Sequence, residues 1–406
     1  MNSADTPRHR IASPQWPAIA LFIALGAIMP LLGLRIAWTL DENQVNAVTK
    51  TLPEGDFANI WAGGRLALES RVTDIFDLDR YRGWFIERFG PETGKREWSY
   101  PPTMLLAGVL LAVLPLLPAA LVWIFGSAAG LGLVLRRLRI PWPTLLATLL
   151  SPGALVSVVY GQTGTAAAAL FIGGLMLAGT SPIAAGVMIG LLTVKPQIGL
   201  LIPVCLIAGG HIRTFVVATV TGLLMLLSTG LLFGWNVFAL YWTETHPMMV
   251  AFLEQPSPEL TQVNEISLFL TLRALGASVT VAYAFQFAAV AVAASATWFL
   301  WRRPMVDPMD RALRVGLTGC LGLMATPYIH NYDMVVYSFA VALMFGRNGW
   351  RISPLILLCW IWPDFVNLLN KTTFPVTPVI VGVFIVYAFL ALRRRDPNSV
   401  EVERPI

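Results

Sequence analysis

The succession of long apolar runs constrains this chain more than any other feature of its sequence. Runs of about 20 residues, the length that a helix needs to cross the hydrocarbon core of a bilayer, follow one another from Trp16 to Leu392. Hydrophobic residues make up 56% of the 406 residues and charged residues only 13%, whereas soluble domains carry about 25% charged residues. A water-soluble globule is therefore excluded, and the sequence predicts an all-α polytopic membrane protein.

The topology follows from the Lys and Arg clusters that interrupt the apolar runs, because short basic loops stay on the cytoplasmic side of a membrane. This rule places the tails 1–15 and 393–406 inside and the polar segments 41–117 and 234–278 outside. About twelve spans are predicted, at residues 16–39, 118–135, 143–160, 164–180, 182–194, 197–210, 213–233, 279–301, 312–326, 331–346, 352–370 and 376–392.

Two parts of this topology are irregular. Residues 101–115 are apolar but short and bounded by prolines, which favours an interfacial helix over a crossing. The predicted spans 182–194 and 197–210 are also short, and Pro196 lies between them. They are either tilted or joined by a break in the helix.

Several functional classes lack support in the sequence. The net charge of +5 resides in the clusters that set topology, so it does not indicate a nucleic-acid partner. Cys205, Cys320 and Cys359 lie singly in apolar segments, which predicts neither a disulfide framework nor a zinc site. Nucleotide-binding and hydrolase motifs do not occur in a suitable context.

The polar residues between the predicted spans gather on one side of the membrane. The topology places outside the residues Asp56, Tyr100, Gln162, Lys195, His246, Asn264 and His330. Ionisable groups near bilayer depth are costly and usually functional. One polar site that faces outward is therefore expected.

Asp56 has two interpretations. It precedes a segment with apolar residues at 57, 60, 61, 66 and 68, a pattern typical of an amphipathic helix lying on the membrane. Composition favours a helix N-cap, in which the carboxylate accepts hydrogen bonds from the first amides. The alternative is a general base that takes a proton from an acceptor hydroxyl, and the two roles can coexist.

The other polar positions also carry paired interpretations. Lys195 is either a snorkelling lysine at a helix end or a ligand for a phosphate monoester. His330, in a segment with Tyr328 and Asn331, is either an interfacial residue or a phosphate contact. Gln162 forms a polar turn or hydrogen-bonds a sugar or phosphate, and the Tyr100 segment is at least a rigid turn with an aromatic anchor.

These motifs, in their order and on their predicted side, resemble the GT-C glycosyltransferases. The resemblance rests on Gly55-Asp56-Phe57, Tyr100-Pro101-Pro102, Gly161-Gln162 and Lys195-Pro196. Within that superfamily the chain is most similar to glycosyltransferase family 87 over about residues 15–390. The best-known members are polyprenyl-phosphate-mannose-dependent mannosyltransferases of bacterial envelopes. The resemblance implies one GT-C domain over 16–392, in the bacterial inner membrane, with interfacial helices in the first outer loop and a periplasmic active site.

The resemblance also implies the reaction and the site. A sugar, mannose before others, would pass from a polyprenyl-phosphate-sugar donor to a lipid or glycan acceptor with inversion. Asp56 would be the base, and His330 and Lys195 would contact the donor phosphate. The expected substrate-binding residues are Tyr100, Gln162, Arg65, His246, Asn264, Tyr328 and Asn331. Residues 58–68 carry no second acid, so neither a metal site nor a cofactor is expected, although a divalent metal stays open.

The main alternative is a secondary transporter or a lipid or glycolipid flippase. Such folds usually contain repeated halves with broken helices in matching positions. Here only Lys195-Pro196 suggests a break, and the charges lie at one face. A non-catalytic scaffold would not need Asp56 and His330 on the same side, so the enzyme is favoured.

Overall fold

The computed structural model describes residues 13–93, 95–255, 263–371 and 375–393, and within these ranges the chain is helical. Isolated bridges, Leu40 with Asn46 and Glu265 with His330, are the extended pairings there. The helices are α1 (Trp16–Ala37), α2 (Phe57–Leu68), α3 (Leu78–Phe89), α4 (Met104–Ala112), α5 (Leu116–Arg137), α6 (Trp142–Leu149), α7 (Pro152–Val159), α8 (Gly164–Leu177), α9 (Pro182–Leu191), α10 (Ile202–Ala208), α11 (Ile212–Phe233), α12 (Asn236–Leu240), α13 (His246–Glu254), α14 (Leu268–Ala274), α15 (Val279–Trp301), α16 (Pro308–Ala325), α17 (Val335–Arg347), α18 (Pro354–Lys371) and α19 (Thr377–Arg393).

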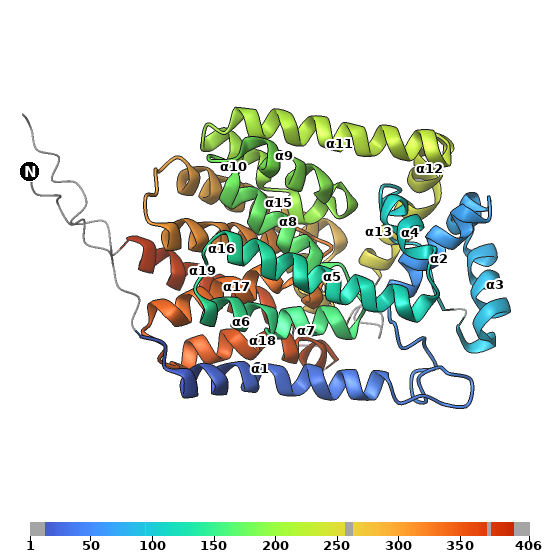
Figure 1. Ribbon diagram of the computed structural model, residues 1–406, viewed down its shortest axis with the longest axis horizontal. Coiled ribbons are helices and arrows are strands. Elements are labelled where there is room, and N and C mark those ends of the chain that lie inside the picture. Colours follow the sequence, from blue (N-terminus) through green and yellow to red (C-terminus); the bar gives the residue numbers. More distant parts are fainter. Residues whose placement is uncertain (1–12, 94, 256–262, 372–374, 394–406) are drawn as a thin grey trace, which may run out of the picture.

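The long helices run side by side along the longest axis of the molecule (Figure 1). α1 and α11 form two opposite edges of the bundle, and α2, α3 and α12 gather at one end (Figure 1). α17 is the central helix, since every residue from Val335 to Phe345 is buried. A helix that is apolar on all sides is stable only when neighbouring helices or lipid surround it.

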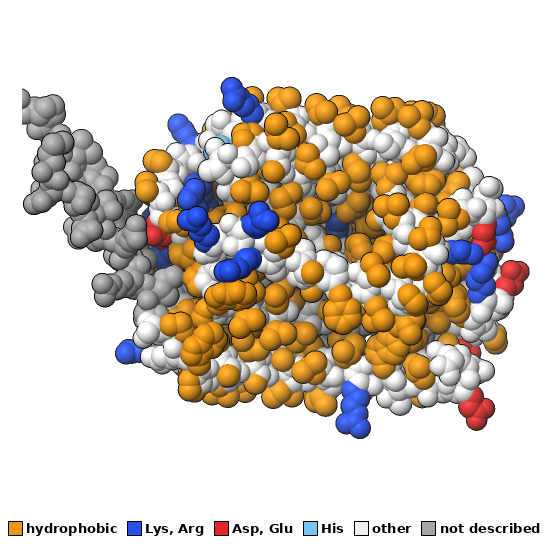
Figure 2. Space-filling view, in the orientation of Figure 1, with side chains coloured by type: hydrophobic (Ala, Val, Ile, Leu, Met, Phe, Trp, Pro, Cys, Tyr) orange, Lys and Arg blue, Asp and Glu red, His pale blue; other side chains and the backbone are white. Residues whose placement is uncertain are grey.

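Apolar side chains cover much of the bundle surface, whereas charged side chains lie mainly toward its two ends (Figure 2). On α11, for example, Leu223, Leu231 and Leu232 are each more than half exposed. Among the described residues, five segments are long and apolar enough to cross a membrane: α1, α5, α6 with α7, α11 and α15. The protein is therefore all-helical and suited to a membrane, while the twelve spans, their orientation and the GT-C fold stay predictions.

The helices are interrupted at two places, one inside a predicted span and one between two short predicted spans. The predicted span 143–160 divides into α6 and α7 at Ser151, which caps α7 by accepting a hydrogen bond from the amide of Ala154. Between α9 and α10 the chain passes through two 3₁₀ turns, Leu192–Val194 and Pro196–Gly199. Lys195 separates these turns with an extended φ of −147°, so of the two alternatives for these short segments, a tilt or a break in the helix, the break is present.

The prediction that the helix after Asp56 lies on the membrane surface with one apolar face is wrong. α2 forms where predicted, but it is enclosed on nearly all sides, with Phe57, Ile60 and Leu66 inaccessible. It packs closely on α4, since a Cβ on Gly64 would lie 2.1 Å from the carbonyl oxygen of Gly108. The glycines thus allow two backbones to touch, which sequence periodicity does not indicate.

The second outer segment is also more structured than a loop. Residues 236–254 form α12, a π-helical turn (Tyr241–Thr245) and α13. Residues 256–262 of the same segment lie outside the described residues, as do 1–12 and 394–406 of the two predicted tails.

Candidate active site

Asp56 lies where two turns from distant parts of the chain meet. Its backbone amide donates to the carbonyl oxygen of Tyr160 over 2.8 Å. Its Oδ2 accepts a hydrogen bond from Gln162 Nε2 at 2.7 Å. The Asp56 side chain is still 44% exposed. The hydrogen bond from Gln162 thus orients the carboxylate, while the exposure leaves it accessible.

Two glycines make this meeting of turns possible. Gly55 and Gly161 both have a φ of +61°, a conformation that favours glycine. A Cβ on Gly55 would lie 2.5 Å from the Tyr160 carbonyl oxygen, and one on Gly161 would lie 2.2 Å from the Glu54 carbonyl oxygen. The Gly55-Asp56 and Gly161-Gln162 motifs are therefore two halves of one contact.

Replacement of Gly161 by alanine should lower the free energy of unfolding by about 1–3 kcal/mol, because the left-handed backbone and the contact with Glu54 both exclude a methyl group. Thermal unfolding of the purified protein in detergent measures the effect. Gly126→Ala, within α5 and with open space around its Cβ position, is the matched control. Equal melting temperatures for the two variants would contradict the close contact of the turns.

The structure separates the two interpretations of Asp56. Asp56 occupies the N-cap position of α2, but its side chain makes no capping hydrogen bond. Its Oδ1 lies 3.9 Å from Nη1 of the buried Arg96, which donates to the Gly55 carbonyl oxygen at 2.9 Å. Burial and the negative charge of Asp56 raise the pKa of the neighbouring Glu97. The Asp56 carboxylate thus points away from the helix amides and into a charged environment.

Lys195 lies in a second cluster, with Asp333, Tyr332 and His330. Its ammonium group forms a buried ion pair with Asp333 and lies 5.0 Å from the centre of the Tyr332 ring. Only 6% of Lys195 is exposed, so the snorkelling alternative is wrong. The π face of Tyr332 and the carboxylate of Asp333 compensate the buried charge.

His330 is packed between two tyrosines. Its ring stacks on Tyr332 with a centroid separation of 4.8 Å and meets Tyr328 edge-on at 4.7 Å. Burial and the nearby Lys195 charge lower the pKa of His330 to about 3. The imidazole is therefore neutral at physiological pH and can offer one N–H donor, but no charge, to a ligand.

Tyr160 connects the two clusters. Its backbone carbonyl accepts the amide of Asp56, and its ring lies 6.0 Å from that of Tyr332. Its hydroxyl accepts a hydrogen bond from Asn367, and Asn367 Oδ1 accepts one from Asn331 Nδ2 at 2.9 Å. The Asp56 and Lys195 clusters are therefore parts of one site.

Most of the residues predicted from the sequence converge there. Tyr100 is buried against Trp98, and burial followed by the charge of Asp56 raises its pKa. The backbone carbonyl of Asn264 accepts the amide of Asn331 at 2.8 Å. The predicted residues brought together are Asp56, Tyr100, Gln162, Lys195, Asn264, Tyr328, His330 and Asn331.

Two predicted residues lie elsewhere. Arg65 is about two and a half helical turns after Asp56 on α2, where it donates to the carbonyl oxygen of Ala112 at 3.4 Å and pairs with Glu69 at 3.6 Å. His246 is exposed at the start of α13, with its ring 4.8 Å from that of Trp242. Both have contacts that hold them apart from the Asp56 and Lys195 clusters.

The sequence interpretation missed several groups of the site. These are Arg96, Glu97, Tyr160, Glu265, Asp333 and Asn367. Asp333 follows His330 closely in the same polar segment, and this proximity could have indicated it. Asn367 lies inside an apolar run with Asp364 and Asn370 three residues to either side, and this helical spacing of polar groups could have indicated it.

Glu265 is a buried acid beside this site. It is 4% exposed, and its Oε2 has no hydrogen-bond partner within the described residues. Burial raises its pKa to about 8. It is one of four carboxylates, with Glu97, Asp56 and Asp333, whose charges raise the pKa of Tyr328 beyond the effect of burial.

The raised pKa of Glu265 predicts a pH-dependent stability. Between the unfolded pKa of about 4.5 and the folded pKa of about 8, the folded state keeps a proton that the unfolded state releases. Stability therefore falls as pH rises through this window. Glu265→Gln removes this loss. The melting temperature of the variant minus that of wild type should therefore increase from pH 5 to pH 8 and stay constant above pH 8. The exposed Glu92→Gln is the control, and a pH-independent difference would contradict the prediction.

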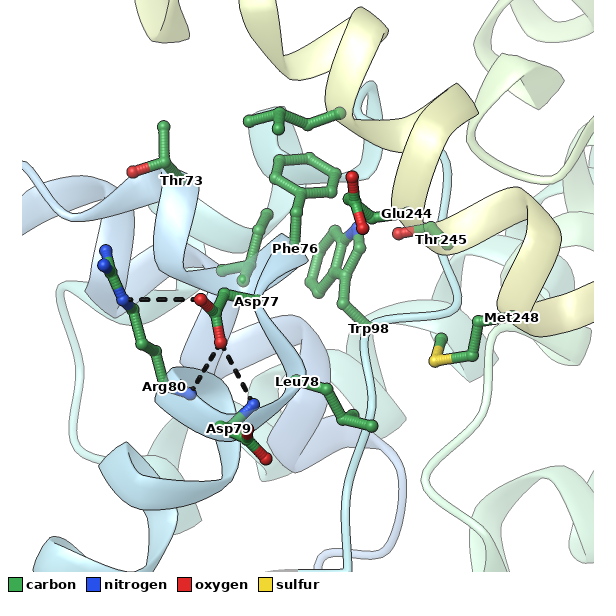
Figure 3. A pocket seen from close by; sticks show the side chains of 12 residues that line it. Thr73, Phe76, Asp77, Leu78, Asp79, Arg80, Trp98, Glu244, Thr245 and Met248 are labelled. Atoms are coloured by element: carbon green, nitrogen blue, oxygen red, sulfur yellow. Dashed lines mark hydrogen bonds and ion pairs between the residues drawn. The ribbon is translucent and has the colours of Figure 1, made fainter.

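A cavity of about 640 Å³ lies next to Trp98. It separates the segment 73–80, with the start of α3, from the segment Leu240–Met248. Figure 3 shows Phe76 and Trp98 near Glu244 and Thr245, with Asp77 bound by Arg80 and by two amides of α3. Trp98, which lines the cavity, lies between it and Tyr100 of the Asp56 site.

Metal ligands do not cluster in the part of the chain that the structure describes, where no three His, Cys, Asp or Glu side chains form a plausible metal site. The expectation that the site works without a metal or cofactor stays a prediction.

The comparison with known families decides the relationship. The sequence pattern of glycosyltransferase family 87 matches residues 98–327, more than half of the chain. The chain belongs to glycosyltransferase family 87. No curated protein and no solved structure matches it.

Membership of family 87 makes the protein a glycosyltransferase, with a sugar donor and an acceptor as its substrates. The matched region contains Tyr100, Gln162, Lys195, His246 and Asn264. Asp56 and Arg65 precede it, and Tyr328, His330 and Asn331 follow it. For the residues outside the matched region, the proposed roles therefore rest on the geometry of the site.

Proposed function

We propose that this family 87 glycosyltransferase moves a sugar, mannose first among the candidates, from a polyprenyl-phosphate-sugar donor to a lipid or glycan acceptor. The observation that carries the proposal is the half-exposed Asp56 carboxylate, oriented by Gln162 and connected through Tyr160 to the Lys195–His330 cluster. This reaction requires a base for the acceptor hydroxyl and a set of hydrogen-bond donors for the leaving phosphate.

The proposed reaction is a single displacement with inversion. The acceptor oxygen forms a bond to the anomeric carbon while the bond from that carbon to the phosphate oxygen breaks. The acceptor proton passes to the Asp56 carboxylate, and polyprenyl phosphate leaves with the bonding electron pair. A general base contributes roughly 10²–10⁴-fold to such a step.

The leaving phosphate would meet Lys195 and His330. Lys195 is a charged donor, held in place by Asp333, and His330 is a neutral N–H donor. Stabilisation of the charge that develops on a leaving group is often worth several kcal/mol. Tyr100, Tyr328, Gln162 and Asn331 would contact the sugar between Asp56 and these two groups.

The acceptor would enter through the cavity beside Trp98. The aromatic side chains of this cavity, Phe76 and Trp98, suit the apolar faces of a sugar, and its carboxylates, Asp77 and Glu244, suit the hydroxyl groups. His246 follows the Thr245 wall and would contact the acceptor rather than the donor.

We further propose the cellular setting from the basic clusters and the apolar runs. The chain would lie in the bacterial inner membrane as a GT-C fold of about twelve spans. Both termini would be cytoplasmic, and the Asp56 site would face the periplasm. No metal or cofactor would take part.

The proposal is tested with purified protein, a panel of polyprenyl-phosphate sugars and a native lipid extract as acceptor. Sugar transfer from one donor supports the function and identifies the sugar. Absence of transfer from every donor, together with movement of labelled lipid across proteoliposome membranes, would favour the flippase alternative.

A further inference from the structure

An arginine-lined cavity lies at the other end of the bundle from the Asp56 site. It has a volume of about 350 Å³ and is formed by the end of α8, the α10–α11 junction and the α15–α16 connection. Its polar side chains are Thr180, His211, Arg302, Arg303, Arg311 and Arg314.

The cavity and the Asp56 site are separated by the length of α8. A Cβ on Gly164, at the start of α8, would meet the carbonyl oxygen of Tyr332, so this end lies at the Asp56 site. Leu175 and Met176, near the other end, line the arginine cavity. A helix of 14 residues spans about 21 Å, so one small ligand cannot occupy both places.

Arg314 is the central group of this cavity. It is 8% exposed, its guanidinium lies 4.2 Å from the centre of the Trp301 ring, and its Nη1 donates to the Arg303 carbonyl oxygen at 3.0 Å. Its Nε is buried and has no hydrogen-bond partner within the described residues, and the same is true of Arg311 Nε. Unpaired donors on a buried cation are costly unless a ligand satisfies them.

Acidic side chains do not compensate these arginines in the described part of the chain. The two nearest along the sequence are already used: Asp307 caps α16, and Asp310 pairs with Arg347. The first turn of α11, which begins beside His211, contains no acid. Burial followed by the Arg314 charge lowers the pKa of His211, which is expected where cations gather without anions.

We propose that this cavity binds a phosphate group, either in the headgroup of an anionic lipid or as free phosphate. A guanidinium matches two phosphate oxygens with two parallel hydrogen bonds, and the helix start at α11 adds a partial positive charge. The Arg302, Arg303, Arg311 and Arg314 cluster also belongs to the face that the sequence places at the anionic cytoplasmic leaflet. The proposal does not depend on the transferase mechanism.

The test is native mass spectrometry of the full protein in neutral detergent, with phosphatidylglycerol or phosphatidylcholine added. Wild type should retain phosphatidylglycerol in preference to the zwitterionic lipid. In Arg302→Gln/Arg303→Gln/Arg311→Gln, retention should fall by about tenfold or more, because each basic residue near an anionic lipid contributes roughly fivefold. Arg302 and Arg303 are exposed and Arg311 is half-buried, and an unchanged melting temperature checks that the fold tolerates the three changes.

The matched control is Arg136→Gln/Arg137→Gln. Both arginines are exposed on the same predicted face, and Arg136 stacks on Trp142 much as Arg314 does on Trp301, but neither lines the cavity. This variant should retain phosphatidylglycerol like wild type.

The source of the phosphate is distinguished by adding inorganic phosphate without lipid. A rise in melting temperature that is lost in the triple variant would support free phosphate as the ligand, and selective lipid retention without that rise would support a headgroup. Equal retention of phosphatidylglycerol by wild type and the triple variant, with no phosphate-dependent rise in melting temperature, would overturn the proposal.

Discussion

Replacement of Asp56 by asparagine should lower the turnover of sugar transfer by about 10²–10⁴-fold with little change in donor binding. Asparagine keeps the size of the side chain and can still accept the hydrogen bond from Gln162, so the turn should stay folded. It cannot take a proton from an acceptor hydroxyl, and the loss therefore falls on the chemical step.

The measurement is single-turnover transfer with saturating donor, together with donor binding by the same variant. Asp41→Asn is the matched control, because Asp41 lies in the same outer segment and its contacts, Lys50 and the amides of Asn43 and Val45, are local to that segment. If Asp56→Asn transferred sugar at the wild-type rate, another group would have to be the base, and Glu97 would be the first to examine.

Replacement of Lys195 by methionine should lower the free energy of unfolding by about 3–5 kcal/mol, the usual result of removing one partner of a buried ion pair. Asp333 is fully inaccessible and would be left without its cation. The double variant Lys195→Met/Asp333→Asn should regain most of the lost stability because no unpaired charge remains. Sugar transfer should stay impaired in both, since neither offers an ammonium group to the donor phosphate.

This pair of variants separates a structural role of Lys195 from a role in donor binding. Lys50→Met removes an exposed partner of Asp41 and should cost less than about 1 kcal/mol, which makes it the matched control for stability. Restored transfer in the double variant would show that Lys195 is needed only to compensate Asp333.

Local patterns in the sequence determined the class of the protein. Apolar runs predict helices and a membrane environment because each residue's preference for lipid or water acts on its own segment. The helices α1, α5, α11 and α15 accordingly begin and end within a few residues of the predicted spans. Prolines also marked Lys195-Pro196 as a break, since proline cannot donate an amide hydrogen to the preceding turn.

The tertiary structure alone decided how the polar motifs combine. Asp56 and Gln162 are 106 residues apart and Lys195 and Asp333 are 138 residues apart, and no local periodicity encodes either contact. The enclosure of α2 depends on glycines that admit the backbone of α4, and the position of Arg65 depends on the direction in which α2 leaves Asp56. Such contacts arise from the packing of whole helices, so the sequence indicated which residues were functional candidates, while packing determined which of them meet.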